Sequence, residues 1–235
     1  KLEEPENVTT VESALQDTFP PIRQKAISAL TFSKKKDDPG LQKRIIELIQ
    51  NDPNSGVRAA GLSFLAEQDS QHPAWKDVYR EALTDSSYRV ARIALNNLHT
   101  VDSAAGLKAA RRLKDLRSNR LRQAVSQIFM AHDAPEVLDY VPRAIHTTSG
   151  MQQMALLQSF ADYATQLEAE SDVDRAIGLL KDLASGSGTW FARWAAIQGL
   201  SEFNDRPAIQ SFIETRIEEE KNPRLKRMLQ QQFGS

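Results

Sequence analysis

The stretch Ile22-Arg23-Gln24-Lys25-Ala26-Ile27-Ser28-Ala29-Leu30 decides the fold, because the chain repeats its pattern. Residues 57–65 read Val-Arg-Ala-Ala-Gly-Leu-Ser-Phe-Leu, and residues 90–98 give a third copy. We define the anchor of each copy as the large apolar residue at the matching position, which gives Ile27, Leu62, Leu95, Val125, Leu157, Ile197 and Leu229. The residue before the anchor is Ala or Gly in five of the seven copies, and the copies with Leu156 and Met228 there are weaker. The anchors are 30 to 40 residues apart. This spacing is typical of solenoids, in which each repeat is a pair of helices.

Each copy carries the apolar stripe of an amphipathic helix. In the first copy the stripe consists of Ile22, Ala26, Ile27 and Leu30, which lie on one side of a helix. A second helical pattern fills each interval, and no β-branched run alternates with period two. We therefore predict an all-α fold, a right-handed α-α superhelix of the HEAT-like or armadillo type. About seven helix pairs should form one domain over residues 1–235.

Two charged positions also recur at fixed distances from the anchors. An aspartate lies ten residues before the anchor, and an arginine four residues before it, which gives Asp17, Asp52, Asp85, Asp115, Arg23, Arg58 and Arg193. An aspartate in the turn can accept from free N–H groups at a helix start, and an arginine one turn later can reach the aspartate of the adjoining repeat. The recurrence favours a structural ladder over unrelated surface charges.

Composition limits the classes of function. Lys and Arg total 30 against 31 Asp and Glu, so no overall field favours a polyanion or an acidic membrane surface. The chain has no Cys, which removes disulfides, thiolate zinc sites and thiol nucleophiles. No apolar run is long enough to span a bilayer, and we expect no membrane partner. The chain begins at Lys1, which we interpret as a sign of trimming or processing, so its compartment stays open.

No catalytic or metal-binding motif stands out. The four histidines, His72, His99, His132 and His146, are too far apart in sequence to pair as zinc ligands on one helix. Ser185-Gly186-Ser187-Gly188 lacks the Lys-Ser/Thr of a phosphate loop, so a connector is favoured. The runs Glu218–Glu220 and Lys34–Lys36 are interpreted as solvated charges. We expect no cofactor on this chain.

Two surface features are candidates for binding. The most basic stretch contains Lys108, Arg111, Arg112, Lys114, Arg117, Arg120 and Arg122. We favour a solvated helix pair there over a phosphate-binding patch on a concave face, because the footprint is narrow. The second feature is the aromatic group Trp190, Phe191 and Trp194, in which Trp194 falls off the anchor stripe. Packing within the long fifth interval and docking of a partner domain are equally favoured.

The residue pattern of the repeats resembles that of known protein families. Asp followed by an apolar residue, Arg and Ala-Ile/Leu is similar to the HEAT signature. Asp52-Pro53-Asn54-Ser55-Gly56-Val57-Arg58, Thr84-Asp85-Ser86-Ser87-Tyr88-Arg89-Val90 and Gly188-Thr189-Trp190-Phe191-Ala192-Arg193-Trp194 resemble the C-terminal HEAT-like domain of bacterial aminopeptidase N-type zinc metallopeptidases of the gluzincin family.

That resemblance implies a non-catalytic domain that packs against the catalytic domain of the same polypeptide and shapes substrate access. The zinc and its HExxH motif would belong to the catalytic domain, since this chain contains no His-Glu-x-x-His. It also points to an exported enzyme of the periplasm or cell envelope. The alternative is a free-standing HEAT-like adaptor that binds a protein or, as a less favoured option, nucleic acid.

Overall fold

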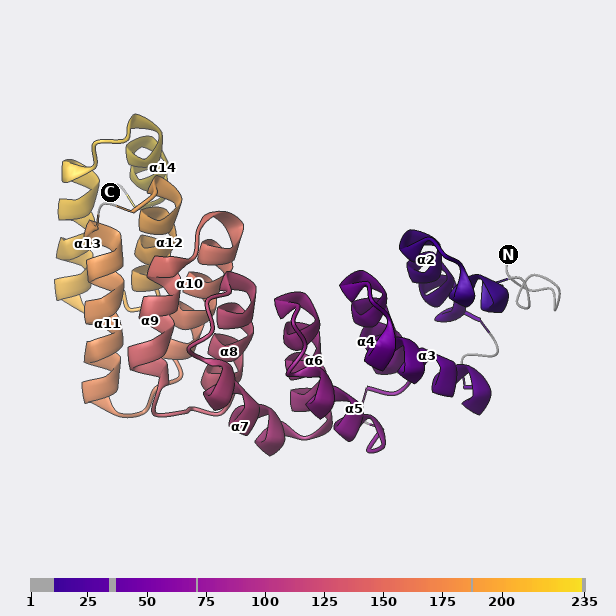
Figure 1. Ribbon diagram of the computed structural model, residues 1–235. Helices are drawn as coiled ribbons and strands as arrows, with labels where there is room; N and C mark the ends of the chain where they lie inside the picture. Colours follow the sequence, from indigo (N-terminus) through magenta and orange to yellow (C-terminus); the bar gives the residue numbers. More distant parts are fainter. Residues whose placement is uncertain (1–10, 34–36, 71, 187, 234–235) are drawn as a thin grey trace. The chain divides into compact units, whose positions relative to one another are not determined.

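The computed structural model describes residues 11–33, 37–70, 72–186 and 188–233. The run Lys34–Lys36 and Ser187 lie outside these ranges. In the described residues all regular secondary structure is helical (Figure 1). None of the described helices combines the length and the apolar character needed to cross a bilayer.

The chain divides into two compact units, one ending at Ile128 and the other beginning at Phe129. Each is described by itself, and the prediction of one domain over residues 1–235 stays a prediction. Unit 1 contains η1 (Ala14–Gln16), α2 (Pro20–Leu30), α3 (Pro39–Asn51), α4 (Ser55–Gln68), α5 (Trp75–Ala82), α6 (Tyr88–Val101) and α7 (Ser103–Leu113). Helix α8 (Asn119–Ala131) belongs to unit 1 up to Ile128. Unit 2 continues with α9 (Val137–Thr147), α10 (Gly150–Ala164), α11 (Glu170–Ser185), α12 (Trp190–Ser201), α13 (Pro207–Glu219) and α14 (Pro223–Phe233).

The helices alternate between two layers. In unit 1, α2, α4 and α6 pack side by side as the second-helix layer, whereas α3 and α5 belong to the first-helix layer (Figure 1). In unit 2, α10, α12 and α14 are neighbours in the same way, and α9 packs on α11. The described elements make seven consecutive pairs, from η1 and α2 to α13 and α14. The predicted all-α fold of stacked helix pairs is therefore confirmed.

The anchors explain why the pairs stack. All seven lie on the second helix of a pair and are exposed by 1% or less: Ile27, Leu62, Leu95, Val125, Leu157, Ile197 and Leu229. Full burial of such a side chain stabilises the fold by about 1.5–3 kcal/mol. A small residue before the anchor allows close helix contact. At Gly61 an added Cβ would lie 2.5 Å from Cγ1 of Ile49, so no side chain fits there.

The turn residues start the helices. The side chain of Asp38 accepts a hydrogen bond from the N–H of Leu41 at the start of α3, at 2.8 Å. Asn54 and Asp102 cap α4 and α7 in the same way. These caps satisfy N–H groups that have no partner within their own helix. These three helices thus begin where the sequence places a polar turn.

Candidate functional site

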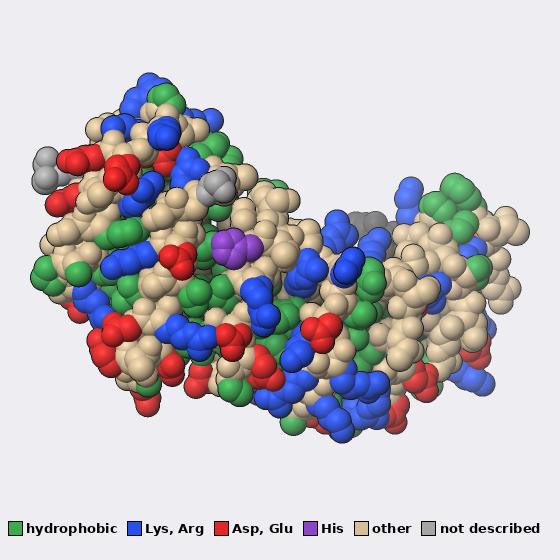
Figure 2. All heavy atoms as spheres, turned by 60° about the vertical axis from the view of Figure 1, so that its left-hand side comes forward, with side chains coloured by type: hydrophobic (Ala, Val, Ile, Leu, Met, Phe, Trp, Pro, Cys, Tyr) green, Lys and Arg blue, Asp and Glu red, His purple; other side chains and the backbone are tan. Residues whose placement is uncertain are grey.

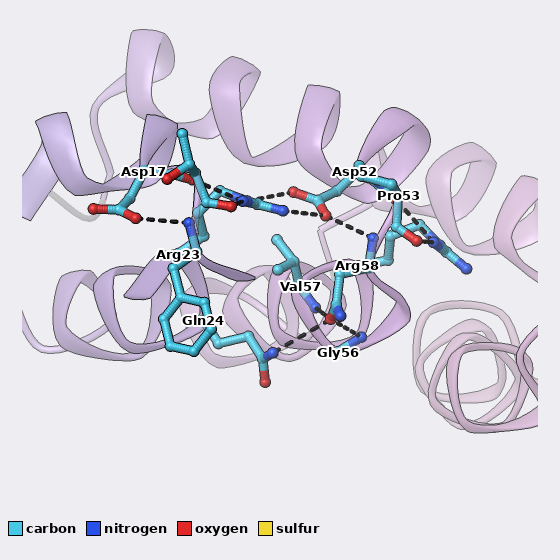
Figure 3. A network of polar contacts seen from close by, with 11 residues as sticks. Asp17, Arg23, Gln24, Asp52, Pro53, Gly56, Val57 and Arg58 are labelled. Atoms are coloured by element: carbon cyan, nitrogen blue, oxygen red, sulfur yellow. Dashed lines mark hydrogen bonds and ion pairs between the residues drawn. The ribbon is translucent and has the colours of Figure 1, made fainter. Parts of the chain in front are cut away.

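The charged ladder begins with Arg23, which is buried between the first two repeats (Figure 3). Its guanidinium binds the carboxylate of Asp52 in the next repeat through two hydrogen bonds, Nε to Oδ2 at 2.7 Å and Nη2 to Oδ1 at 2.8 Å. Nη1 donates to the backbone carbonyl of Asp17 at 2.7 Å. The hydrogen bond to Asp52 is the main cause that raises the pKa of Arg23. The side chain therefore remains charged and joins two repeats.

Arg58 repeats this geometry one unit later. It binds Asp85 at 2.7 and 2.8 Å and donates to the carbonyl of Asp52 at 2.8 Å. Burial alone would raise the pKa of Asp85, but the hydrogen bonds from Arg58 and from the N–H of Ser87 lower it overall. Both carboxylate oxygens of Asp52 and of Asp85 accept hydrogen bonds. These aspartates therefore bind protein groups of their own chain.

The remaining predicted ladder residues behave differently. Asp115 is exposed, because Ala91 occupies the position of the arginine that would have reached it. Asp17 accepts from the N–H of Phe19 at 2.7 Å. Arg193 binds Glu220 at 2.9 and 2.8 Å, which the sequence reasoning missed. Glu220 lies nine rather than ten residues before its anchor and is a glutamate, so the aspartate offset could not find it.

The predicted basic stretch does not form one patch. Lys108, Arg111 and Arg112 lie on α7, in the first-helix layer, whereas Arg120 and Arg122 lie on α8. Lys114 and Arg117 occupy the turn between these helices. Figure 2 shows Lys and Arg side chains gathered around α5 and α7. The turn after α7 reverses the chain between the two layers, so these residues are divided between two helices, and the solvated helix pair stays the favoured interpretation.

Arg120 lies instead near Arg92 and Arg89 of α6, and we call these three residues the arginine cluster. Burial is the main cause that lowers the pKa of Arg92, followed by the charges of Arg120 and Arg89. The Nε atom of Arg92 is buried and has no hydrogen-bond partner in the described residues. The sequence analysis missed the cluster. Arg92 lies three residues before its anchor and Arg120 five residues before the next one, so no shared offset connects the two in the sequence.

A groove lies beside the cluster on the second-helix layer of unit 1. It has a volume of about 250 Å³ and is lined mainly by small side chains of α2 and α4 and by Phe32, Glu67 and Arg89. Phe32 is 83% exposed, although it is a large apolar residue. Exposed apolar surface of this kind marks interaction sites when it borders polar groups. Arg89 belongs both to the groove and to the arginine cluster.

The aromatic group of unit 2 is less exposed than expected. The rings of Trp190 and Phe191 stack at 3.6 Å, and the guanidinium of Arg224 lies 5.1 Å from the centre of a Trp190 ring. The indole Nε1 of Trp194 is buried. Of the three, only Phe191 is exposed, at 43%. Arg224 of α14 lies over Trp190, and the docking of a partner at this aromatic group stays a prediction.

Comparisons with known proteins bear on the fold. No family model matches the chain, and no curated protein matches it. Among solved structures, Escherichia coli YibA is similar at 12% identity over 98% of this chain and 82% of its own, with a TM-score of 0.65. YibA is a HEAT-like helical protein. The fold is HEAT-like.

Two further similar structures have lower TM-scores. Human deoxyhypusine hydroxylase in complex with glycerol is 12% identical over 99% of this chain and 84% of its own, with a TM-score of 0.40. An engineered protein is 14% identical over 97% of this chain and 95% of its own, with a TM-score of 0.38. Neither likeness adds to the argument for the fold.

The expected membership of an aminopeptidase is wrong. YibA, with a TM-score of 0.65, is a free-standing helical-repeat protein and not the C-terminal domain of a zinc aminopeptidase. The expectation that this chain is the non-enzymatic part of such an enzyme is also wrong. A fold does not determine function, so the HEAT-like fold gives no ground for excluding catalysis. The recurring pattern of an aspartate in the turn and an arginine six residues later reflects the packing of helix pairs.

Proposed function

We propose that the chain is a HEAT-like adaptor that holds a segment of another protein on the second-helix face of unit 1. We define this face as the exposed side of α2, α4, α6 and α8 up to Ile128. The observation that carries the proposal is the open groove between α2 and α4, with Phe32 exposed at its border. Stacked repeats create extended surfaces of this kind, which suit an extended partner.

The charge of this face supports a selective surface. Its helices carry Arg23, Lys25, Arg58, Arg89, Arg92, Arg120 and Arg122 against the single acid Glu67. Arg23 and Arg58 are used in the ladder, and the other five remain as a basic excess. Complementary charge speeds encounter with a partner and fixes its orientation.

Photo-crosslinking tests the proposal. A photoreactive phenylalanine at Ser63, which lines the groove, is compared with one at Lys43, an exposed residue of α3 in the first-helix layer. We expect Ser63, and not Lys43, to crosslink to a defined protein. That protein, once purified, should bind the unmodified chain with one-to-one stoichiometry in calorimetry.

A groove-filling variant completes this test. Ser63→Trp should weaken binding of the purified partner about tenfold or more, because the indole occupies the space of the segment. Lys43→Trp is the matched control and should bind as the original chain does. Equal crosslinking from both positions, or unchanged affinity of Ser63→Trp, would refute the proposal.

A further inference from the structure

Unlike Arg23 and Arg58, the residues of the arginine cluster form no ion pair between repeats in the part of the chain that the structure describes. Arg89 and Arg92 are three residues apart on α6, a spacing that places them on one side of the helix. Arg120 begins α8 and lies close enough to act on the charge of Arg92. No acid contributes to the shift of Arg92, which contrasts with Arg23 and Arg58. Among the described residues, three positive groups thus lie close together without an acidic partner.

This arrangement is unfavourable in the absence of an anion. Like charges repel, and the repulsion grows as water is excluded. Arg92 is half-buried, and its buried Nε lacks a hydrogen-bond partner in the described residues. Buried donors in folded proteins nearly always have a partner, and an exception calls for an explanation. An anionic group bound from outside would supply both the missing acceptor and the missing charge.

We propose that the arginine cluster binds carboxylates of an acidic segment of the partner, and that an apolar side chain of the same segment lies in the groove between α2 and α4. The inference rests on the proposed function and names the chemistry of the partner. Arg89 connects the two subsites because it lines the groove and belongs to the cluster. The segment therefore runs across α2, α4 and α6.

The neighbouring groove favours a peptide over a nucleic acid. Ser28, Ala59, Ala60 and Phe32 offer small and apolar surface that suits a peptide side chain. Glu67 lines the same groove and disfavours any anionic group inside it, so the groove takes the uncharged side chain and the acidic residues lie at the arginine cluster. An arginine binds a carboxylate in a bidentate manner, and Arg23 with Asp52 shows this geometry in the same layer. Selective recognition of acidic residues beside an apolar one follows.

Fluorescence anisotropy with the full chain tests this inference. The probes are a labelled peptide in which glutamates flank a phenylalanine, the same peptide with glutamine for glutamate, and a single-stranded oligonucleotide of equal charge. We expect the glutamate peptide to bind at least about tenfold more tightly than either other probe. Arg92→Gln should weaken that binding about tenfold, whereas Arg112→Gln on α7 should leave it unchanged.

Each other outcome counts against the cluster. If the oligonucleotide binds more tightly than the glutamate peptide, and Arg92→Gln weakens that binding, the cluster is a nucleic-acid site instead. Glutamate-peptide binding that is unaffected by Arg92→Gln, and also by the exposed-site variant Arg120→Gln, would remove the cluster from recognition. The second variant guards against a folding defect at the half-buried Arg92. If Ser63 still crosslinks the purified partner in such a case, only this inference fails. If the chain with the photoreactive residue at position 63 and no arginine substitution also fails to crosslink, the proposed function fails together with this inference.

Discussion

Unit 1 and unit 2 hold the same helix pairs together by different polar contacts. In unit 1, Arg23 and Arg58 form consecutive buried ion pairs, each with the aspartate of the following repeat. In unit 2 the corresponding position of α10 is Gln153, whose amide donates to the carbonyl of Ile145 at 3.0 Å. Only α12 of that unit carries the arginine, Arg193. Where this position is polar, its side chain donates to a backbone carbonyl that precedes its own helix, and the ion pair is an addition.

The two units also differ in where their charges lie. The sequence up to Ile128 holds 20 Lys and Arg against 16 Asp and Glu, and the remainder holds 10 against 15. Unit 2 places ion pairs at its surface, such as Arg206 with Asp174 at 2.7 Å, where the aspartate side chain is 63% exposed. Exposed pairs contribute about 0–1 kcal/mol each. The buried ladder should therefore matter more to unit 1 than ion pairs do to unit 2.

The largest effects should come from charges placed at the close helix contacts. Ala94 in unit 1 and Ala196 in unit 2 are fully buried. Ala94→Asp and Ala196→Asp should each destabilise their own unit by about 4 kcal/mol or more, because an unpaired charge is buried. Hydrogen exchange should show lost protection in α4 and α6 for the first variant and in α10 and α12 for the second. Native exchange in both variants would contradict the assigned repeat register.

Removal of a ladder acid should have the next largest effect, and more in unit 1. Asp52→Ala leaves Arg23 buried without its carboxylate, which should cost about 3–5 kcal/mol in urea unfolding. Glu220→Ala should cost less, because the arginine that it leaves unpaired, Arg193, is more exposed to water than Arg23, at 16% against 10%. Asp115→Ala serves as the control and should change stability by less than about 0.5 kcal/mol, since Asp115 is exposed. Equal losses at Asp52 and Glu220 would remove the distinction between the units.

Acid should weaken the ion pair of Arg58 with Asp85 in unit 1 and that of Arg193 with Glu220 in unit 2. Hydrogen bonding from Arg193 is the main cause that lowers the pKa of Glu220, and the pKa of Asp85 is also lowered. The pKa in the unfolded chain is 4.5 for Glu220 and 3.8 for Asp85, and folding lowers both. Each carboxylate therefore stabilises the folded state fully at a pH above its unfolded pKa. This contribution is lost as the pH falls from there through the lower pKa of the folded state. Each carboxyl accounts for at most about 1.4 kcal/mol per pH unit. Glu220→Gln should flatten the acid dependence of the free energy of unfolding below pH 4.5, and an unchanged slope would contradict the assignment.

The smallest effect is expected at Trp194. Its indole Nε1 is buried without a hydrogen-bond partner in the described residues. Trp194→Phe removes this unsatisfied donor along with some apolar contact, so the two changes should offset one another to within about 1.5 kcal/mol. Trp194→Gln should lower the melting temperature more, because it removes the aromatic packing. A greater loss in the phenylalanine variant would show that the indole N–H has a partner.

The fold could be read from the sequence because one offset fixes the packing. The anchor rule placed every anchor in the core, since a large apolar residue after a small one fits only where two helices approach closely. It could not place the boundary between the units, because α8 runs through Ile128 and Phe129 without a change of helical pattern. The expected membership of an aminopeptidase was wrong for a related reason, because the HEAT residue pattern reflects helix packing and does not indicate the function of the protein.

The candidate site was less accessible to sequence reasoning. Neighbours along the chain suggested that Lys108 and Arg120 share a surface, but the turn after α7 sends them to different layers. Arg92 and Arg120 are 28 residues apart and meet only because consecutive second helices lie side by side. A charge cluster in a repeat protein follows the period of the repeat. Alignment of the copies is therefore a better guide than a local count of charges.

Asp52 accepts hydrogen bonds from arginines of two different repeats, through its carboxylate and through its carbonyl. If the turn that contains Asp52 becomes disordered, Arg23 and Arg58 therefore lose a hydrogen-bond acceptor at the same time. Such a link couples the local opening of adjacent repeats, as nearest-neighbour descriptions of repeat arrays require. Ala91 and Leu121 stand where further arginines would extend the coupling, so it stops at the third repeat. The first three repeats should accordingly open as one cooperative block, and the repeats that follow should fluctuate on their own.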